Sequence, residues 1–405
     1  MSFTEIPILD LALVDDPETK PQFLADLRHA LMEVGFLYLK NVGIPDALFE
    51  RVINEGKAFF DIPREEKLKI EMKNAPSFLG YSQLSAEITA GALDHREQID
   101  LSTEHPLPGP DAPAHHNLLA PNQWPSPAVL PNFRPVFTEY MERMGAVSIR
   151  FTSLIAEAVG LPPRAFDKYF DQPRQQHKLK VVKYPDAAEL GLAADGAEGR
   201  HQGVGPHKDS MLTSYLLQAS PHRGLQAQNA RGAWVDCPPV EGTLVVAIGQ
   251  GLEALTQGAC RATTHRVLSP AAGSGPRFSI PFFQGVRGDA TFEDLEAGGV
   301  GRVPDEVREL RRRIDGTLGS GADAVEFTFR TGAANGGART LGEATLRNRV
   351  KSHPDVGERW YPEILRDIRE QQAREGREEK AQDASRRGGD PVELSSGRAQ
   401  SVEAH

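Results

Sequence analysis

The sequence lacks the features that mark a secreted or membrane-embedded protein. It holds only two cysteines, Cys237 and Cys260, which excludes a disulfide framework and favours a reducing compartment. No run approaches the roughly 18 consecutive apolar residues that a membrane-spanning helix needs. The first residues carry no basic stretch followed by an apolar segment, so no secretion signal is expected. A cytoplasmic protein that contacts no membrane is therefore predicted.

Excess positive charge is also absent. The formal net charge is −10 at pH 7 and the body of the chain has no basic tract, so nucleic acid is not expected as a partner. Aromatic residues make up 7% of the chain, too few to suggest a stacking platform for a planar ligand. No pattern indicates an oligomeric state. The 405 residues suffice for a sizeable core, and a small molecule is the expected partner.

The chain does contain a short motif with two metal-binding side chains, His207-Lys208-Asp209. Alternate residues of a strand point to one face, so a strand here would direct His207 and Asp209 toward a common point. The aliphatic, aromatic and β-branched residues at 211–217 favour such a strand. A His-x-Asp triplet alone is expected about once by chance in a chain of this composition, so further residues must support it.

A second imidazole follows in the short β-favouring run at 262–267, which contains His265. Two imidazoles and one carboxylate on one face of a metal leave the opposite face open, an arrangement typical of non-haem Fe(II) oxygenases. We therefore predict that His207, Asp209 and His265 are catalytic iron ligands.

The open face of such an iron can be chelated by the keto and C1 carboxylate oxygens of a 2-oxo acid, with one position left for O2. The far carboxylate of that acid then needs a partner. Arg277 is the candidate, because a guanidinium fork matches a carboxylate bidentately. Ser279 lies on the same strand face and adds a hydroxyl donor, and Tyr184 could supply a third.

Two similar triplets are interpreted as structural. His353-Pro354-Asp355 contains a proline, which cannot donate to a sheet, and is interpreted as a helix start with a capping box formed by Asp355 and Glu358. His95-Arg96-Glu97 is a weaker triplet of the same kind. The pair His115-His116 is assigned to a solvated loop, and His201 is left out of the metal set because two glycines separate it from His207.

With these motifs in place, the chain resembles the isopenicillin N synthase-like branch of the Fe(II)/2-oxoglutarate-dependent dioxygenases. The resemblance runs over most of the chain, through residues 6–11, 35–39 and 43–45, the His207, His265 and Arg277 motifs, and the segments 351–355 and 358–361, which are similar to fungal members. It implies an α+β fold with a distorted double-stranded β-helix (jelly roll) core flanked by helices. It also implies iron ligation and 2-oxoglutarate contacts by the residues named above.

The resemblance implies an oxidoreductase that hydroxylates, desaturates or cyclises a small organic molecule, a secondary metabolite for a fungal-type member, with release of succinate and CO2. Three alternatives remain open: an oxidase that works without 2-oxoglutarate, an ethylene-forming enzyme that breaks down 2-oxoglutarate itself, and a non-catalytic jelly-roll binder of small acids. Ile248-Gly249-Gln250 and Cys260-Arg261-Ala262 depart from the family pattern without removing a ligand. The substrate of a relative is therefore not carried over.

The expected layout has five parts. They are an N-terminal α/β region at 1–130 with an irregular cover loop at 74–132, a helical segment at 131–175, the jelly-roll core at 176–290, a C-terminal helical extension at 291–370, and a disordered charged tail at 371–405. Within the cover loop, Tyr81, Gln98 and Trp124 are possible substrate neighbours. The Gly- and Ala-rich insert 186–205 is expected to be a solvent loop or a lid. Helices are expected at 133–159, 307–314 and 356–369.

Overall fold

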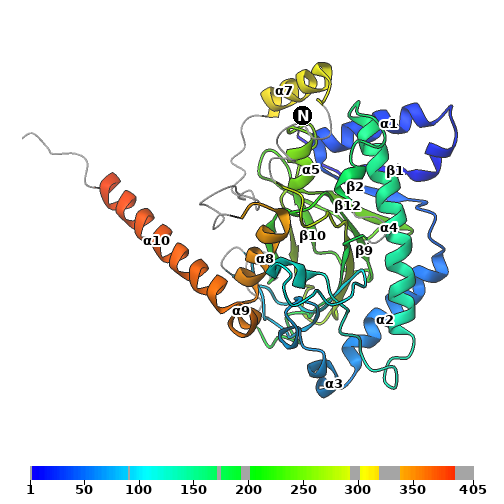
Figure 1. The fold of residues 1–405 in the computed structure, drawn as a ribbon. Helices are drawn as coiled ribbons and strands as arrows, with labels where there is room; N and C mark the ends of the chain where they lie inside the picture. The colour runs from blue at the N-terminus through cyan, green and yellow to red at the C-terminus, as the bar shows by residue number, and fades with distance from the viewer. Residues whose placement is uncertain are drawn as a thin grey trace, which may run out of the picture.

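The computed structural model describes residues 2–89, 92–170, 175–192, 201–291, 302–318 and 338–387. Two β-sheets pack against each other at its centre, with helices around them (Figure 1). The larger sheet has the strand order β1 (Ile8–Asp10), β2 (Phe36–Lys40), β12 (Thr243–Ile248), β9 (Thr213–Gln218), β14 (Arg277–Phe283), β7 (Lys178–Tyr184), β6 (Glu97–Ser102), β3 (Gly80–Ser82). The smaller sheet has the order β11 (Trp234–Asp236), β10 (Leu225–Gln228), β13 (His265–Leu268), β8 (Gln202–His207).

Every pairing between neighbouring strands of these two sheets is antiparallel except that of β1 with β2. A separate two-stranded ribbon joins β4 (Ile88–Thr89) to β5 (Ala92–Leu93). Together with the solved structures reported below, this arrangement confirms the predicted α+β jelly-roll fold. The N-terminal strands β1, β2, β3 and β6 extend the core sheet and do not form a sheet of their own. The division of the chain at 130, 175 and 290 stays a prediction.

The two faces of the larger sheet bury different sets of side chains, because neighbouring residues of a strand point to opposite faces. The outer face packs Val181, Tyr215 and Phe282 against α4 (Phe133–Ala158) in the main core. The inner face packs Val182 and other small apolar residues against the smaller sheet. Helices α1 (Lys20–His29), α2 (Asp46–Asp61) and α4 cover the outer side in Figure 1.

Shorter elements connect these layers. They are α3 (Arg64–Lys69), α5 (Gln250–Leu255), the 3-10 turns Leu11–Asp15, Met72–Asn74, Ala114–Leu118 and Asp167–Tyr169, and the π-helical turn Ala30–Val34. The helix predicted at 133–159 is confirmed by α4, and the helix predicted at 307–314 is confirmed by α7 (Asp305–Leu318). No helix in the described ranges is long and apolar enough to cross a membrane.

The C-terminal helices α8 (Leu341–Ser352), α9 (Pro354–Trp360) and α10 (Pro362–Arg387) form one group. Their buried residues, which include Leu346, Val356 and Leu365, pack with Phe78 and Leu118 of the predicted cover loop in a small separate core. This contact holds the end of the chain against the segment that follows α3.

The capping box predicted at Asp355 and Glu358 is wrong. Helix α9 begins at Pro354, with His353 as N-cap and no side-chain cap, because a proline suits the first helical position. A capping box does occur earlier, where Thr340 and Glu343 cap α8 reciprocally. The helix predicted at 356–369 is broken at Tyr361, because Pro362 lacks the N–H that would continue α9 and starts α10 instead.

Two predictions of irregular structure are also wrong in part. The segment 371–387 is helical in α10 and not disordered, since its Glu, Lys, Arg, Ala and Gln residues favour helix even without an apolar face. Residues 388–405 lie outside the described part. The cover loop predicted at 74–132 contributes β3 and the buried strand β6 to the core sheet. Of the insert 186–205, residues 193–200 lie outside the described part, and 202–205 already belong to β8.

His177 links the start of β7 to the core and gives a prediction for stability. Its ring is 3% exposed, and its Nδ1 accepts the backbone N–H of Gly285 at 3.1 Å. Burial lowers the pKa of His177 to about 4, whereas the unfolded chain titrates near its usual 6.5. Between these values the unfolded state binds more protons, so stability should fall as the pH drops from 6.5 to 4 and then level off.

The shift corresponds to on the order of 3 kcal/mol of unfolding free energy across that window. We expect His177→Gln to reduce this pH dependence, measured by urea unfolding at several pH values. The control is His29→Gln, at an exposed histidine of α1. An unchanged pH dependence in His177→Gln would show that His177 does not carry it.

Candidate active site

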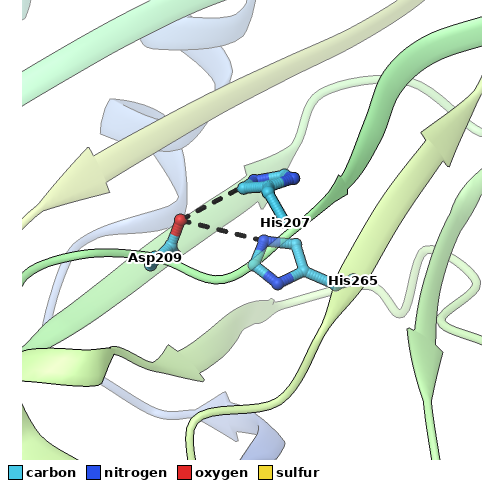
Figure 2. Close-up of side chains that lie close together, drawn as sticks. All are labelled: His207, Asp209 and His265. Carbon is cyan, nitrogen blue, oxygen red and sulfur yellow. Dashed lines mark ion pairs between the residues drawn. The ribbon is translucent and has the colours of Figure 1, made fainter. Parts of the chain in front are cut away.

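The three predicted metal ligands lie together between the two sheets, at the end of β8 and the start of β13 (Figure 2). His207 is the last residue of β8 and stands directly opposite His265, the first residue of β13. Their ring centroids are 4.2 Å apart. Oδ1 of Asp209 lies 3.8 Å from Nε2 of each histidine. Two imidazoles and one carboxylate thus face a single point, with their ligand atoms within 4.8 Å of one another.

Asp209 reaches this point from a loop, so the prediction of a continuous strand through His207 and Asp209 is wrong. Strand β8 ends at His207 and β9 starts at Thr213. The loop is held by α5, because the backbone N–H groups of Gly249 and Gln250 donate to the carbonyls of Leu212 and Asp209 at 2.9 and 2.8 Å. These two residues belong to the segment that departs from the family pattern, and they position the carboxylate through their backbone.

Each ligand is oriented by a second contact. Nδ1 of His207 lies 2.8 Å from the carbonyl oxygen of Gly205, and Nδ1 of His265 lies 3.1 Å from that of Thr263. A carbonyl only accepts, so Nδ1 carries the proton and Nε2 presents its lone pair to the common point. Oδ2 of Asp209 accepts a short hydrogen bond from the hydroxyl of Ser214, which leaves Oδ1 facing the histidines.

The electrostatics of the site suit a divalent cation. Burial and the neighbouring His265 lower the pKa of His207 to about 3, so its imidazole is neutral at physiological pH. A histidine binds a metal as the neutral imidazole, and His207 is in that form. The donor set therefore fits the facial arrangement that non-haem iron adopts.

The predicted co-substrate residues lie on neighbouring strands of the larger sheet. Arg277 of β14 pairs in register with Tyr184 of β7, and Ser279 pairs with Val182. The guanidinium of Arg277 is 1% exposed, lies 5.1 Å from the centroid of the Tyr184 ring, and donates to Gln218 at 3.2 Å. Tyr184 thus offers its ring face to Arg277, in addition to any role of its hydroxyl.

A cavity of about 830 Å³ lies beside the candidate iron ligands and two of the predicted co-substrate residues, whereas Arg277 is not among its lining residues. Its wall includes the three candidate iron ligands, Ser279 and Tyr184. The cover segment contributes Glu87 and Arg96, and α8 with its following residue contributes Arg349 and His353. The wall of the cavity is therefore built from segments that lie far apart in the sequence.

Several sequence predictions fail at this cavity. Tyr81, Gln98 and Trp124 are not among its lining residues; their side chains donate to Glu97, to Glu87 and Asp100, and to Glu104. His115 and His116, predicted to lie in a solvated loop, line the cavity with their rings at 4.7 Å.

Sequence reasoning missed the charged side chains of the cavity wall. Lys178 and Lys180 share the inner face of β7 with Tyr184. Their spacing of two residues from one another could have indicated this, because alternate residues of a strand point to one face. Arg96 and His353 stood in triplets set aside as structural, and both line the cavity. Their shared location depends on tertiary contacts that no local pattern reveals.

Two family models match the chain. The one described as "non-haem dioxygenase in morphine synthesis N-terminal" matches residues 6–127, and the 2OG-Fe(II) oxygenase superfamily model matches residues 176–286. The chain is 64% identical to the 2-oxoglutarate-dependent dioxygenase frbJ of Dothideomycetidae sp., over 93% of this chain and 98% of that protein. It is 38% identical to a 2-oxoglutarate-dependent dioxygenase of Gibberella zeae, over 92% and 95% of the two chains.

The fold is also similar to solved structures. A full-length Neurospora crassa protein, solved in complex with alpha-KG and thymine, superposes with a TM-score of 0.60 at 24% identity, over 77% of this chain and 97% of that chain. This likeness supports the same jelly-roll architecture.

The hydrogen bond from Ser214 to Asp209 generates a prediction for metal affinity. We expect Ser214→Ala to weaken Fe(II) binding roughly 10- to 100-fold, because the carboxylate loses the contact that fixes its orientation. Anaerobic competition with a chromophoric chelator measures this affinity. Ser274→Ala, in a loop where the hydroxyl donates to Ala271, serves as the control. Equal Fe(II) affinity in Ser214→Ala and the control would contradict the orienting role.

Proposed function

The chain belongs to the 2OG-Fe(II) oxygenase superfamily, and we propose that His207, Asp209 and His265 hold its Fe(II) while Arg277 and Ser279 hold 2-oxoglutarate. The protein is a 2-oxoglutarate-dependent dioxygenase that oxidises a small organic molecule. The observation that carries the assignment of residues is the single point faced by two imidazoles and one carboxylate in the cavity wall. The family agrees with the fold and function predicted from the sequence.

Iron with bound 2-oxoglutarate supplies the oxidising chemistry, in which O2 is consumed and succinate and CO2 are released. The role of Arg277 is to bind the far carboxylate of 2-oxoglutarate, because its buried guanidinium offers a charge-assisted donor pair. Ser279, one alternation further along β14, directs its hydroxyl into the same cavity. Tyr184 stacks on Arg277 and limits its movement.

The walls around this co-substrate position are apolar. Val182, Val245 and Val267 belong to the core between the two sheets and also line the cavity. They give this part of the wall an apolar surface, and an electrostatic contact made beside an apolar surface is stronger than one made in water. The fixed orientation of the ligands and of Arg277 thus positions the co-substrate before a substrate arrives.

We further propose that the substrate is a secondary metabolite and that the enzyme works in the cytoplasm. The cavity of about 830 Å³ has room for a second small molecule beside 2-oxoglutarate. The relatives at 64% and 38% identity are fungal proteins. This agrees with the resemblance of segments 351–355 and 358–361 to fungal members of the family. Cys237 and Cys260 are buried free thiols, which suits a reducing compartment.

Replacement of Arg277 tests the co-substrate assignment. We expect Arg277→Gln to raise the dissociation constant of 2-oxoglutarate about 100-fold, which corresponds to about 3 kcal/mol for the loss of a charged donor pair. The measurement is an anaerobic titration of the Fe(II)-loaded protein, followed by the visible charge-transfer band of the chelated 2-oxo acid. The control Arg223→Gln removes an exposed arginine that pairs with Asp236.

Thermal unfolding of both variants reports whether the buried substitution leaves the fold intact. A folded Arg277→Gln protein with wild-type affinity for 2-oxoglutarate would place the far carboxylate elsewhere. Absence of the band in wild type at millimolar 2-oxoglutarate would overturn the assignment of the whole site.

A further inference from the structure

One wall of the cavity carries several charged side chains that the binding of iron and 2-oxoglutarate does not use. They are Glu87, Arg96, Lys178, Lys180, Arg349 and His353. They come from the cover segment, from β7 and from the end of α8. Charged groups in a cavity wall are costly unless they are paired or serve a ligand.

The carboxylates of this wall are paired. Glu87 forms a short ion pair with Arg96 and accepts a hydrogen bond from Gln98 at 2.8 Å. Asp94 lies 3.1 Å from Arg96, and Asp100 lies 3.3 Å from Lys180. Arg96 and Lys180 thus bind all three carboxylates.

The remaining acidic and imidazole groups do not change this balance. Asp289 at the rim forms a two-pronged ion pair with Arg287, at 2.7 Å for each contact. Burial lowers the pKa of His353, which keeps its ring neutral beside Glu87.

Two cations of the wall remain without a carboxylate of their own. Nζ of Lys178 donates to the carbonyl of Leu118 at 2.7 Å, and among the described residues no carboxylate lies within 4.0 Å of it. Arg349 likewise has no ion pair within the described ranges, although it lies close enough to affect Glu87 and Lys178 electrostatically.

Burial and the nearby charge of Arg349 lower the pKa of Lys178 to about 7. Lys178 and Arg349 are thus the two cations of this wall that Glu87, Asp94 and Asp100 do not pair at ion-pair distance.

The register of the sheet fixes how far the backbone of Lys178 lies from that of Ser214, which stands beside the iron ligands. Lys178 on β7 pairs with Phe283 on β14, and Phe283 pairs with Ser214 on β9. Ser214 in turn contacts Asp209. Two strand spacings therefore separate Lys178 from Ser214, a distance of about 10 Å. The intervening surface is apolar, since Phe283 and its neighbours Pro281 and Leu216 line the cavity.

We propose that the substrate is an organic acid whose carboxylate binds Lys178 and Arg349, with an apolar segment that runs along Phe283 toward the iron ligands. The two cations without a carboxylate partner in the described ranges, and their separation from the iron ligands by Phe283, together assign this substrate class. The carbon that is oxidised then lies several bonds from the carboxylate. This proposal rests on the proposed function, because it takes the iron position from His207, Asp209 and His265.

The test uses hexanoate as a probe, with hexanamide and hexylammonium as matched probes of the same length. Each is titrated by calorimetry into the anaerobic complex of the protein with Fe(II) and 2-oxoglutarate, so that Arg277 is already occupied. We expect saturable binding of hexanoate and at least tenfold weaker binding of hexanamide and hexylammonium. Arg349→Gln and Lys178→Met should each weaken hexanoate binding about tenfold, the loss of one charge-assisted contact.

Arg347→Gln is the control variant, because Arg347 lies on the same helix but donates to Gln371 and does not line the cavity. It should bind hexanoate as wild type does. Circular dichroism shows whether each variant keeps its fold, and Arg349→Lys, which retains the charge, should restore part of the affinity. The 2-oxoglutarate titration should be the same in wild type, Arg349→Gln and Lys178→Met.

The proposal is overturned if hexanamide binds as tightly as hexanoate, if hexanoate does not bind at tens of millimolar, or if Arg349→Gln and Lys178→Met bind it as wild type does. It is also overturned if hexanoate displaces 2-oxoglutarate and depends on Arg277 alone. Failure of the visible band to form in wild type concerns the proposed function instead. Calorimetry with hexanoate still reports on Lys178 and Arg349 in that case, because neither is a proposed iron ligand.

Discussion

The pairing of β8 with β13 is the constraint on which the site depends. Residues directly opposite on antiparallel strands hold their side chains about 5 Å apart, and this register places His207 against His265. A shift of one residue would turn either imidazole to the other face of the sheet. The register shifts between His265 and Val267, where the ladder is irregular, so Val267 pairs with Val204 in the core between the sheets. Pairing of β8 with β13 thus brings the two candidate histidine ligands together.

Much of this site follows from local sequence because its residues lie on strands with clear alternation. The motif at 207–209 and the later His265 were enough to predict three side chains that lie together in the structure, whereas the role of Arg277 stays a prediction. The position of Asp209 was less predictable, because its loop is held by backbone donors of α5, and a backbone donor leaves no trace in residue type. The prediction that residues 371–387 are disordered was wrong for a different reason. Charged residues of high helix propensity need no apolar face to form a helix.

The charged wall could not be predicted, because ion pairs join segments that are distant in sequence. Arg96 binds Glu87 within the cover segment, but Lys180 reaches Asp100 only when β6 pairs with β7. Arg349 joins them only when α8 packs on the residues near Leu118. Such a wall costs desolvation energy that hydrophobic residues would not. The charged wall therefore lowers stability, and in return the cavity has a polar surface opposite its apolar one.

Helices α8 and α9, which pack on the cover segment, come after the candidate ligands in the sequence. The last candidate ligand of iron and 2-oxoglutarate, Ser279, precedes α8 in sequence, whereas Arg349 and His353 belong to its end. Of the two cations proposed to bind the substrate carboxylate, Lys178 lies on the same core strand as Tyr184, and Arg349 lies in a helix outside the core strands. If Arg349 binds the substrate as proposed, substitutions at the end of α8 change which molecules are accepted and leave His207, Asp209 and His265 unaltered, so a lineage can diversify its substrates without rebuilding its iron site.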